Sequence, residues 1–283
     1  MGIRKFKPTT PGRRGMVVNT FEEITTTKPY KPLTVTLKKH AGRNNTWRLT
    51  VRHKGGGHAK RYRLMDFYFH DKKGIPAKVE TIEYDPYRTG WIALVCYKDG
   101  ERRYVLAHTE MKVWDTIITD EKAKLVPGNR MLVANIPVGI PVYNVELIVG
   151  QGASSVRSAG SSATIVSQDG EYSQVKMPSG EIRLVNKKCY VTIGQVSNPD
   201  HNQIVIWKAW RSRWMWKRPT VLGKSMNPVD HPHGWGEGHS PIGMKAPKTP
   251  WGMPALGYKT RKKKKTTNRW ILKTRKGKLL LKK

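Results

Sequence analysis

One stretch decides the fold of this chain: Trp91-Ile-Ala-Leu-Val-Cys-Tyr-Lys-Asp-Gly-Glu-Arg-Arg-Tyr-Val-Leu-Ala107. Two runs of aliphatic, aromatic and β-branched residues flank Lys98-Asp-Gly100. Asp-Gly between two such runs is a strong signal for a tight β-hairpin. The stretch therefore predicts two antiparallel strands, at 91–97 and 103–107, joined by a short turn.

More short strands surround this hairpin. Residues 78–84 alternate apolar and polar side chains with a period of two, and 111–118 reads as a further strand. Short strands at this spacing predict a small antiparallel barrel. The candidate for residues 66–121 is a five-stranded barrel of the oligonucleotide-binding (OB) type.

The next segment repeats this pattern with different strands and predicts a second barrel, of SH3-like size, over 122–200. Asp169-Gly170 and Ser179-Gly180 are tight-turn signals within it. The expected strands are Met131–Ala134, Val142–Ile148, Ala163–Ser167, Tyr172–Met177, Glu181–Val185 and Cys189–Ile193. The Gly- and Ser-rich stretch 150–162 is either a linker or a backbone-amide cradle for phosphate clamped by Arg157.

The net charge of +33 is concentrated at the two ends of the chain. Residues 1–65 carry 16 basic and 2 acidic groups, and 201–283 carry 21 and 2, whereas 66–200 balance to zero. Such a distribution predicts a polyanionic partner. It also predicts four parts: a basic N-terminal extension (1–65), the OB-type barrel (66–121), the SH3-like barrel (122–200) and a basic C-terminal extension (201–283).

The cysteines and the hydropathy of the chain limit its possible cellular environment further. Cys96 and Cys189 give neither a disulfide framework nor a metal-ligand spacing, and both fall in apolar strand-like runs that predict buried thiols. No apolar run approaches the ~18 residues of a membrane span, and the first residues lack an apolar signal core. We therefore expect no membrane partner and a reducing compartment.

The N-terminal extension contains an acid-free stretch, Arg52-His-Lys-Gly-Gly-Gly-His-Ala-Lys-Arg-Tyr-Arg63. Its three glycines would let the backbone approach phosphates that the surrounding cations neutralise. The alternative is a flexible solvated loop. The glycines lack the Gly-Lys-Ser/Thr ending of a nucleotide-binding P-loop.

A Trp-rich basic stretch, 207–219, precedes the C-terminal extension's most unusual segment. Trp207, Trp210 and Trp214 have helical spacing up to Pro219. We expect Trp207 and Trp210 to pack the helix against the second barrel, and Trp214 or Trp216 to stack on a base.

The segment 223–238 has no helical or strand period. Its Gly and Pro residues exclude a regular ladder, and the backbone that carries Asp230, His231 and His233 can approach a partner surface closely. Zinc binding by His231, His233 and His239 is the alternative to RNA contact, but the His-Pro-His order is poorly arranged for chelation. The final arm, 259–283, has 13 basic residues and no acid, so by itself it is not expected to fold. A nuclear localisation signal at 261–265 is the alternative reading of its basic run.

The polyanion is expected to be RNA. Readers of DNA sequence usually present a helix to the major groove, and none is evident. Near-neutral barrels with basic arms suit a folded RNA, with steeply salt-dependent binding.

These residues resemble one family closely along almost the whole chain: the universal large-subunit ribosomal protein L two, in its bacterial form. The motifs that carry the resemblance are Gly42–Asn45, His53–His58, Gly74–Ala77, Glu83–Pro86, Tyr97–Tyr104, Pro127–Asn129, Asn135–Gly139, Arg157–Gly160, Arg218–Val221, Met226–Gly234 and Thr249–Gly252. The resemblance implies an OB-fold domain, an SH3-like domain and extensions into large-subunit rRNA. It also implies a position near the peptidyl transferase centre, where Asp230, His231 and His233 form the proximal loop.

The side chains expected to bind rRNA are basic, aromatic or amide groups of the two extensions and the second barrel, together with the glycines between them. They are Arg43, Arg52, His53, Lys54, Gly55, Gly56, Gly57, His58, Lys60, Arg61, Arg63, Arg157, Arg211, Arg213, Trp214, Lys217, Arg218, Asn227, Arg261, Lys262 and Lys263. Other expected partners are ribosomal proteins and small-subunit rRNA at the subunit interface, with no small-molecule substrate. No cofactor is expected apart from Mg²⁺ that accompanies the rRNA.

Three departures from the family pattern are visible. Trp235 replaces a usual glycine, 207–216 is bulkier than the usual Gly/Ala-rich run, and the tail beyond Lys259 is individual. No catalytic residue is expected. The rival hypotheses are an RNA hydrolase using Asp230, His231 and His233, and a free RNA chaperone. A cytoplasmic ribosome is the expected location, with an organelle of bacterial descent as the alternative.

Overall fold

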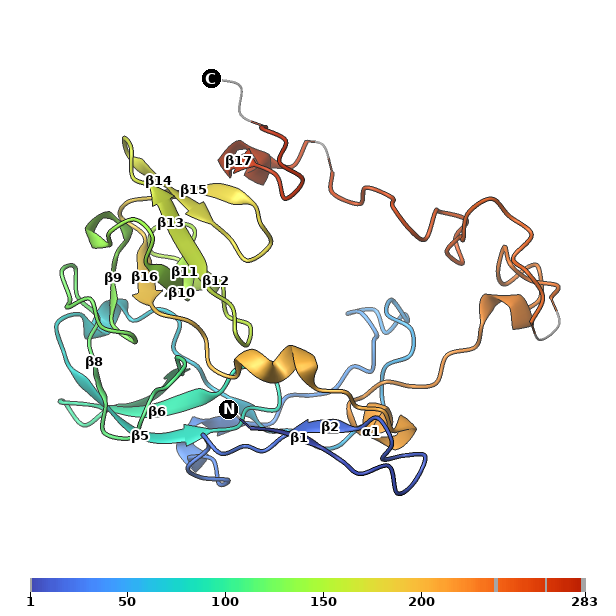
Figure 1. Cartoon of the computed structure of the whole chain (residues 1–283), viewed down its shortest axis with the longest axis horizontal. Helices are drawn as coiled ribbons and strands as arrows, with labels where there is room; N and C mark the ends of the chain where they lie inside the picture. The colour runs from blue at the N-terminus through green and yellow to red at the C-terminus, as the bar shows by residue number, and fades with distance from the viewer. Residues whose placement is uncertain (1, 237–238, 263, 281–283) are drawn as a thin grey trace. The chain divides into compact units, whose positions relative to one another are not determined.

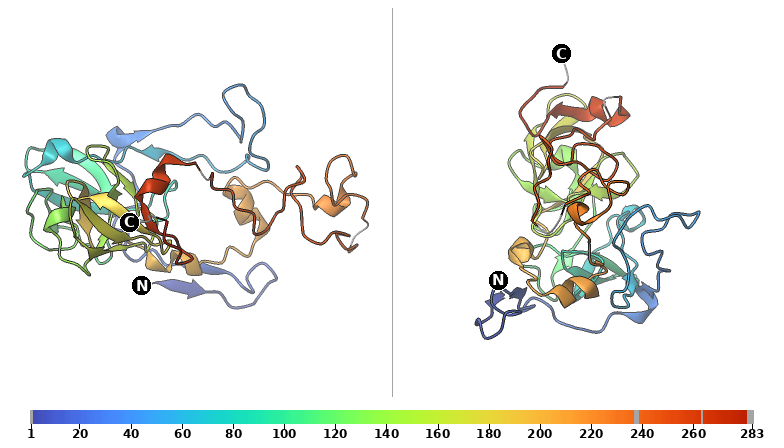
Figure 2. Two further views of the ribbon diagram at one scale, coloured as in Figure 1. Left: turned by 90° about the horizontal axis from the view of Figure 1, so that it is seen from above. Right: turned by 90° about the vertical axis from the view of Figure 1, so that its right-hand side faces the viewer.

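A computed structural model describes residues 2–236, 239–262 and 264–280, and it divides the chain into two compact units. Unit 1 consists of residues 1–38, 59–208 and 267–283, and unit 2 consists of residues 39–58 and 209–266. Unit 1 contains the β-sheets, whereas unit 2 is drawn mostly as extended loops (Figure 2). No helix in the described ranges is long and apolar enough to cross a membrane.

The predicted hairpin forms the centre of the first sheet. The strand order is β7-β6-β5-β8, with every neighbouring pair antiparallel. Figure 1 labels β5, β6 and β8 of this sheet. Gly100 adopts the positive φ of 86° that the tight turn requires, and its N–H donates to the Tyr97 carbonyl. The strands are β5 (Ala77–Glu83), β6 (Ile92–Tyr97), β7 (Arg102–Leu106) and β8 (Thr116–Ile117).

The strand expected at 111–118 is much shorter than predicted, because only Thr116 and Ile117 belong to β8. The carboxylate of Asp115 accepts a hydrogen bond from the backbone N–H of Lys112, and Trp114 has a φ of 77°. A local side-chain-to-backbone bond of this kind competes with a sheet ladder. Residues 112–115 of this segment therefore form a turn, and only the two residues that follow it form a strand.

The second sheet has the order β17-β15-β14-β13-β10-β16-β9 (Figure 1). Its strands are β9 (Arg130–Leu132), β10 (Pro141–Tyr143), β13 (Ala163–Ser167), β14 (Tyr172–Lys176), β15 (Ile182–Asn186), β16 (Tyr190–Ile193) and β17 (Ile271–Lys273). The turns expected at Asp169-Gly170 and Ser179-Gly180 are present, with φ of 63° and 83° at the glycines. The mainly β class, with an OB-type and an SH3-like barrel, is thereby confirmed; the four-part division of the chain stays a prediction.

The strand expected at 142–148 is split by Asn144 into β10 and β11 (Val145–Glu146). Asn144 is buried with a φ of 54°, a left-handed conformation that asparagine tolerates. The backbone N–H of Asn144 donates to the Val156 carbonyl, and its backbone carbonyl accepts a hydrogen bond from the Arg130 guanidinium. β11 then pairs with β12 (Ala153–Ser155), so part of the Gly/Ser-rich stretch is a strand.

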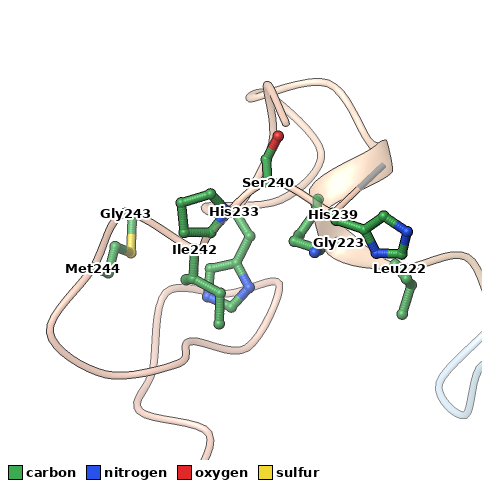
Figure 3. Close-up of a pocket in the computed structure, with 10 residues that line it drawn as sticks. Leu222, Gly223, His233, His239, Ser240, Ile242, Gly243 and Met244 are labelled. Atoms are coloured by element: carbon green, nitrogen blue, oxygen red, sulfur yellow. The ribbon is translucent and has the colours of Figure 1, made fainter. Parts of the chain in front are cut away.

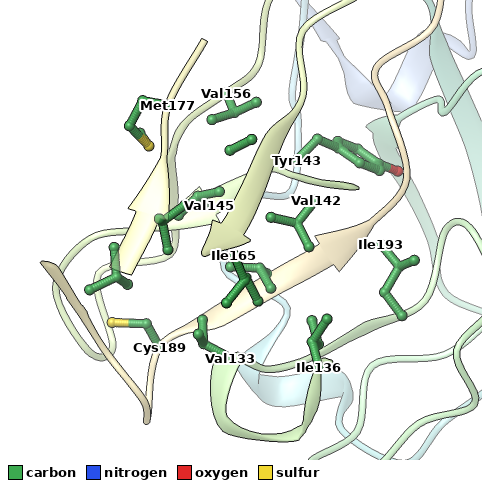
Figure 4. Packing of buried hydrophobic residues seen from close by; sticks show 14 of the residues in the cluster. Val133, Ile136, Val142, Tyr143, Val145, Val156, Ile165, Met177, Cys189 and Ile193 are labelled. Atoms are coloured by element: carbon green, nitrogen blue, oxygen red, sulfur yellow. The ribbon is translucent and has the colours of Figure 1, made fainter. Parts of the chain in front are cut away.

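Two large apolar clusters form the core of unit 1. One fills the second barrel around Val133, Ile165 and Val191, and it includes Leu106 from β7 of the first barrel (Figure 4). The second fills the first barrel and includes Ala93 and Val95 of β6, whereas Ile92 and Leu94 pack on the other side of that strand with Tyr104. Burial on both faces explains why 91–97 reads as an uninterrupted apolar run.

Two buried charged side chains, Arg130 and Glu146, accompany this core. The Arg130 guanidinium donates to the carbonyl of Asn144 at 2.8 Å and to that of Tyr190 at 3.3 Å, and it lies 4.9 Å from the Phe69 ring centroid. Burial lowers the pKa of Arg130 to about 10, and the charge of Glu146 opposes that shift. The Glu146 carboxylate is fully buried and accepts the N–H groups of Gly152 and Tyr190.

The two cysteines differ in burial. Cys189 is fully buried, and burial raises the pKa of its thiol to about 12. Cys96 is only half-buried, because β6 places it near the end of the hairpin; the prediction that both thiols are buried is therefore wrong for Cys96.

The basic tail is not wholly extended chain. Residues Thr266–Trp270 form a 3₁₀ turn, and β17 pairs antiparallel with β15 at the edge of the sheet. The Ile271 side chain is buried in unit 1. The expectation that the tail beyond Lys259 does not fold by itself stays a prediction, because 266–273 take their structure against β15 of the barrel, where apolar residues interrupt the charges and complete the sheet edge.

The remaining elements are short. In unit 1, Trp207 donates its indole N–H to the Pro11 carbonyl at 2.6 Å and packs over Gly15, so it contacts the N-terminal hairpin and not the second barrel as expected. The remaining strands are β1 (Ile3–Lys5), β2 (Val17–Asn19), β3 (Thr34–Val35) and β4 (Tyr62–Arg63). The helical segments are η1 (Lys31–Leu33), η2 (His70–Lys72), η3 (Val133–Asn135), η4 (Pro199–Gln203), η5 (Gly223–Ser225) and α1 (Ala209–Trp214).

Acidification is expected to weaken unit 1 through His108. This side chain is buried, and desolvation lowers its pKa despite a hydrogen-bonding contact with the Thr109 carbonyl. A base whose pKa is lower in the folded state contributes stability above its unfolded pKa of ~6.5, and that stability is lost as the pH falls below this value. Urea denaturation at pH 7 and pH 5 should show a drop on the order of 1 kcal/mol that is absent in His108→Gln.

Candidate RNA interface

Two sequence-distant stretches form one structure in unit 2. The Gly55 N–H donates to the Trp216 carbonyl at 3.1 Å, and the His58 N–H donates to the Trp214 carbonyl at 3.1 Å. In the other direction, the Arg218 N–H donates to the His53 carbonyl at 3.1 Å. We call 52–58 together with 213–219 the paired segment. It joins the predicted glycine-rich basic stretch to the end of the Trp-rich stretch.

The three glycines allow this pairing. A Cβ on Gly57 would lie 2.4 Å from the Trp216 indole and 2.6 Å from the Trp214 carbonyl oxygen. Gly55 and Gly56 adopt φ of 132° and 68°, conformations that favour glycine. The sequence-based explanation, close approach to phosphate, is therefore incomplete, because Gly57 is required first by an internal contact.

Gly57→Val is expected to open the paired segment, because its branched side chain would collide with both the Trp216 ring and the Trp214 backbone. We expect amide hydrogens of Gly55 and His58 to exchange at least tenfold faster in the variant, with rRNA affinity lowered. Gly100→Asn is the control, because a Cβ there meets open space and asparagine tolerates a positive φ. Unchanged exchange at Gly55 and His58 in Gly57→Val would contradict this role.

Aromatic rings cover the paired segment. The Trp214 ring stacks on His58 with centroids 5.4 Å apart, and Lys39 Nζ lies 3.8 Å from the Trp216 ring centroid. Trp216 also donates its indole N–H to the His58 carbonyl. The helix α1 is shorter than the spacing of the tryptophans indicated, because Trp207 has a φ of 57° and lies outside it. Trp210 is 64% exposed, so the expectation that it seals the helix is wrong.

The paired segment brings together five predicted RNA-binding cations. Arg52, Lys54, Lys217 and Arg218 are exposed, and Arg213 is half-buried beside Gly56. Arg43 and Arg211 belong to the same unit, where Arg43 is exposed and Arg211 half-buried.

Other predicted residues lie in unit 1. Arg63 is buried, with its guanidinium donating to the Arg61 carbonyl, and Lys60 donates to Pro86. Arg61 is exposed. Arg157 is exposed, but its guanidinium lies 4.6 Å from the Phe67 ring centroid.

We call residues 223–236 the histidine loop, and hydrogen bonds from the backbone of the chain hold its histidine rings in place. His231 is buried, and its Nδ1 accepts the His233 N–H at 3.0 Å. The Nε2 of His233 accepts the Lys248 N–H at 2.8 Å. Desolvation and the nearby His231 and Lys248 lower the pKa of His233, so this ring favours its neutral form. Asp230 is exposed, and it is the His233 backbone that orients the His231 ring.

Two glycines of this loop are required by close contacts. A Cβ on Gly223 would lie 2.7 Å from the His231 ring, and one on Gly234 would lie 2.6 Å from the Asn227 backbone. The carbonyl of Asn227 in turn accepts the N–H groups of Asp230 and His231. The loop therefore has a defined shape of its own.

An open hollow of about 760 Å³ adjoins His233 and His239 (Figure 3). Leu222, Lys224, His233, His239 and Met244 are among its lining residues. Over the described parts of the chain, no group of three or more His, Cys, Asp or Glu side chains could hold a metal ion. The hollow is mainly apolar with two imidazoles on its surface.

Trp235 is the most conspicuous side chain of the loop. It is 91% exposed and has a φ of 74°, a rare conformation for a bulky residue. The family resemblance places glycine here, and the backbone keeps a conformation suited to glycine while carrying an indole.

Further along the chain, Arg261 and Lys262 are exposed, and Lys263 lies outside the described residues. Three contacts were not predicted from the sequence. They are Lys39 on the Trp216 ring, the stacking of His58 on Trp214, and the Trp251 ring, which lies 5.4 Å from the Arg52 guanidinium. Lys39 lies in the acid-free run between Glu23 and Asp66, which is a signal that could have found it.

The two barrels and the cationic, aromatic paired segment define an RNA-binding β-barrel protein. Two family models match the chain: "Ribosomal Proteins L2, RNA binding N-terminal domain" over residues 30–119, and "Ribosomal Proteins L2, C-terminal domain" over 126–252. The chain belongs to the ribosomal protein L2 family. It is a structural constituent of the large ribosomal subunit that binds rRNA.

Proposed function

We propose that unit 2 makes the chief rRNA contacts of this protein, through the paired segment and the exposed cations beyond it. The observation that carries this proposal is the charge of the unit: its residues include 18 basic and 2 acidic side chains. Loops without a large core gain little from burial, so their positive charge favours a partner that supplies phosphates.

We further propose that the histidine loop organises the peptidyl transferase region and that the protein supports subunit association. Ribosomal proteins and small-subunit rRNA are the proposed partners at that interface. The buried His231 and its backbone-held ring support a positioning role, since a general base must reach its substrate proton. We propose no enzymatic activity and no cofactor beyond Mg²⁺ carried by the rRNA.

Sedimentation of the tagged protein from a gentle lysate tests this function. We expect it to travel with the large ribosomal particle, to resist moderate salt and to be released by ribonuclease. A protein that stays light, or spreads over all RNA sizes and dissociates in modest salt, would support a free RNA chaperone.

His231→Ala separates the structural role from hydrolysis. The proposal expects no RNA cleavage by either the parent or the variant, and a defect in particle assembly or activity in the variant. Turnover of RNA by the parent that is lost in His231→Ala would establish the hydrolase. His239→Ala, which changes an exposed histidine just beyond that loop, is the matched control.

A further inference from the structure

A second concave site lies in unit 1, where the C-terminal segment meets the second barrel. Its volume is about 380 Å³, within the range of small-ligand sites. β17 and the preceding turn lie beside β14 and β15 there (Figure 1). The lining residues come from three places in the sequence: 147–151, β14 with β15, and 267–270.

One wall of this cavity is aromatic. The rings of Tyr172 and Trp270 have centroids 5.2 Å apart and an interplanar angle of 41°. Both side chains are half-buried, so each keeps part of its ring surface available to the cavity. The Arg269 guanidinium lies 4.8 Å from the Trp270 ring centroid. Aromatic rings backed by a cation form the type of platform on which an unpaired base stacks.

The charge of the cavity selects the class of occupant. Arg183 and Arg269 line it, and among the described residues that line it none is acidic. The side chains of Ile148 and Val149 form an apolar rim and are 63% and 51% exposed. An apolar peptide would desolvate both guanidinium groups without pairing them, which is costly. A nucleotide supplies a base for the rings and a phosphate for the arginines.

We propose that this cavity binds one unstacked nucleotide of rRNA, with its base against Tyr172 and Trp270 and its phosphate at Arg183 and Arg269. The inference rests on the proposed rRNA binding and adds a second, single-nucleotide site on unit 1. The tail thereby has two roles: β17 completes the sheet edge, and the turn before it supplies the stacking residue.

Short-wavelength ultraviolet crosslinking of the full chain to large-subunit rRNA tests the proposal. We expect a crosslinked nucleotide on peptides containing Tyr172 or residues 267–270, with a yield reduced about tenfold in Trp270→Leu. Arg183→Gln, which leaves the apolar packing in place, should lower rRNA affinity several-fold. Trp114→Leu is the aromatic control, because this 66% exposed ring lies on the first barrel.

Three outcomes would count against the site. Normal rRNA binding without a crosslink at the cavity, and with both cavity variants binding like the parent, overturns the inference and leaves the proposed function intact. A crosslink from the cavity to another protein in the intact particle also overturns it, in favour of a protein partner. Failure of the parent chain to bind large-subunit rRNA overturns the proposed function and this inference together.

Discussion

The triple variant Arg52→Gln, Lys54→Gln and Arg218→Gln is expected to bind large-subunit rRNA about 100-fold more weakly near 0.15 M salt. These three exposed cations lie on both stretches of the paired segment, Arg52 and Lys54 on 52–58 and Arg218 on 213–219. Each phosphate neutralised contributes ~0.7 to 0.9 to the slope of log affinity against log salt. The variant should therefore also show a slope that is smaller by about 2 to 3.

The salt slope separates lost phosphate contacts from lost folding. Filter binding between 0.05 and 0.5 M salt gives both the affinity and the slope. A matched variant with Lys122, Lys176 and Lys188 changed to glutamine removes the same charge from exposed positions of unit 1. If the two triple variants lose affinity equally, general charge and not the paired segment accounts for binding.

Arg130→Met is expected to lower the free energy of unfolding by about 3 to 5 kcal/mol. The substitution removes the hydrogen bonds to the Asn144 and Tyr190 carbonyls and the coulombic attraction between the guanidinium and the buried Glu146 carboxylate, which keeps its contact with His70 Nε2 at 3.4 Å. A buried charge that loses a nearby opposite charge keeps its desolvation cost and loses part of the compensating attraction. Urea denaturation of the whole chain, followed by circular dichroism, measures the effect.

A double-mutant cycle with Glu146→Gln tests the electrostatic explanation. If charge coupling dominates, the double variant should be less destabilised than the sum of the two single variants, because no unpaired charge remains. Additive costs would assign the loss to hydrogen bonds and packing alone. A cost below ~1 kcal/mol for Arg130→Met would show that the cluster is not essential to the core.

The mainly β fold could be predicted from the sequence because its signals are local. Asp-Gly at 99–100 fixes a tight turn, and the apolar run 91–97 reports burial on both faces of one strand. Errors occurred where a side chain bonds its own backbone, as Asp115 does, or where one residue takes a left-handed conformation, as Asn144 does. Such bonds leave no trace in hydrophobic periodicity.

The sequence by itself determined the class of partner, since the separation of charge along the chain requires no knowledge of the fold. Only the tertiary structure decided which residues meet. It pairs 52–58 with 213–219, assigns Gly57 to the Trp216 contact, buries Arg63 and docks Ile271 on β15. The physical reason is that pairing between distant segments depends on the chain path and on steric fit, which composition and spacing do not encode.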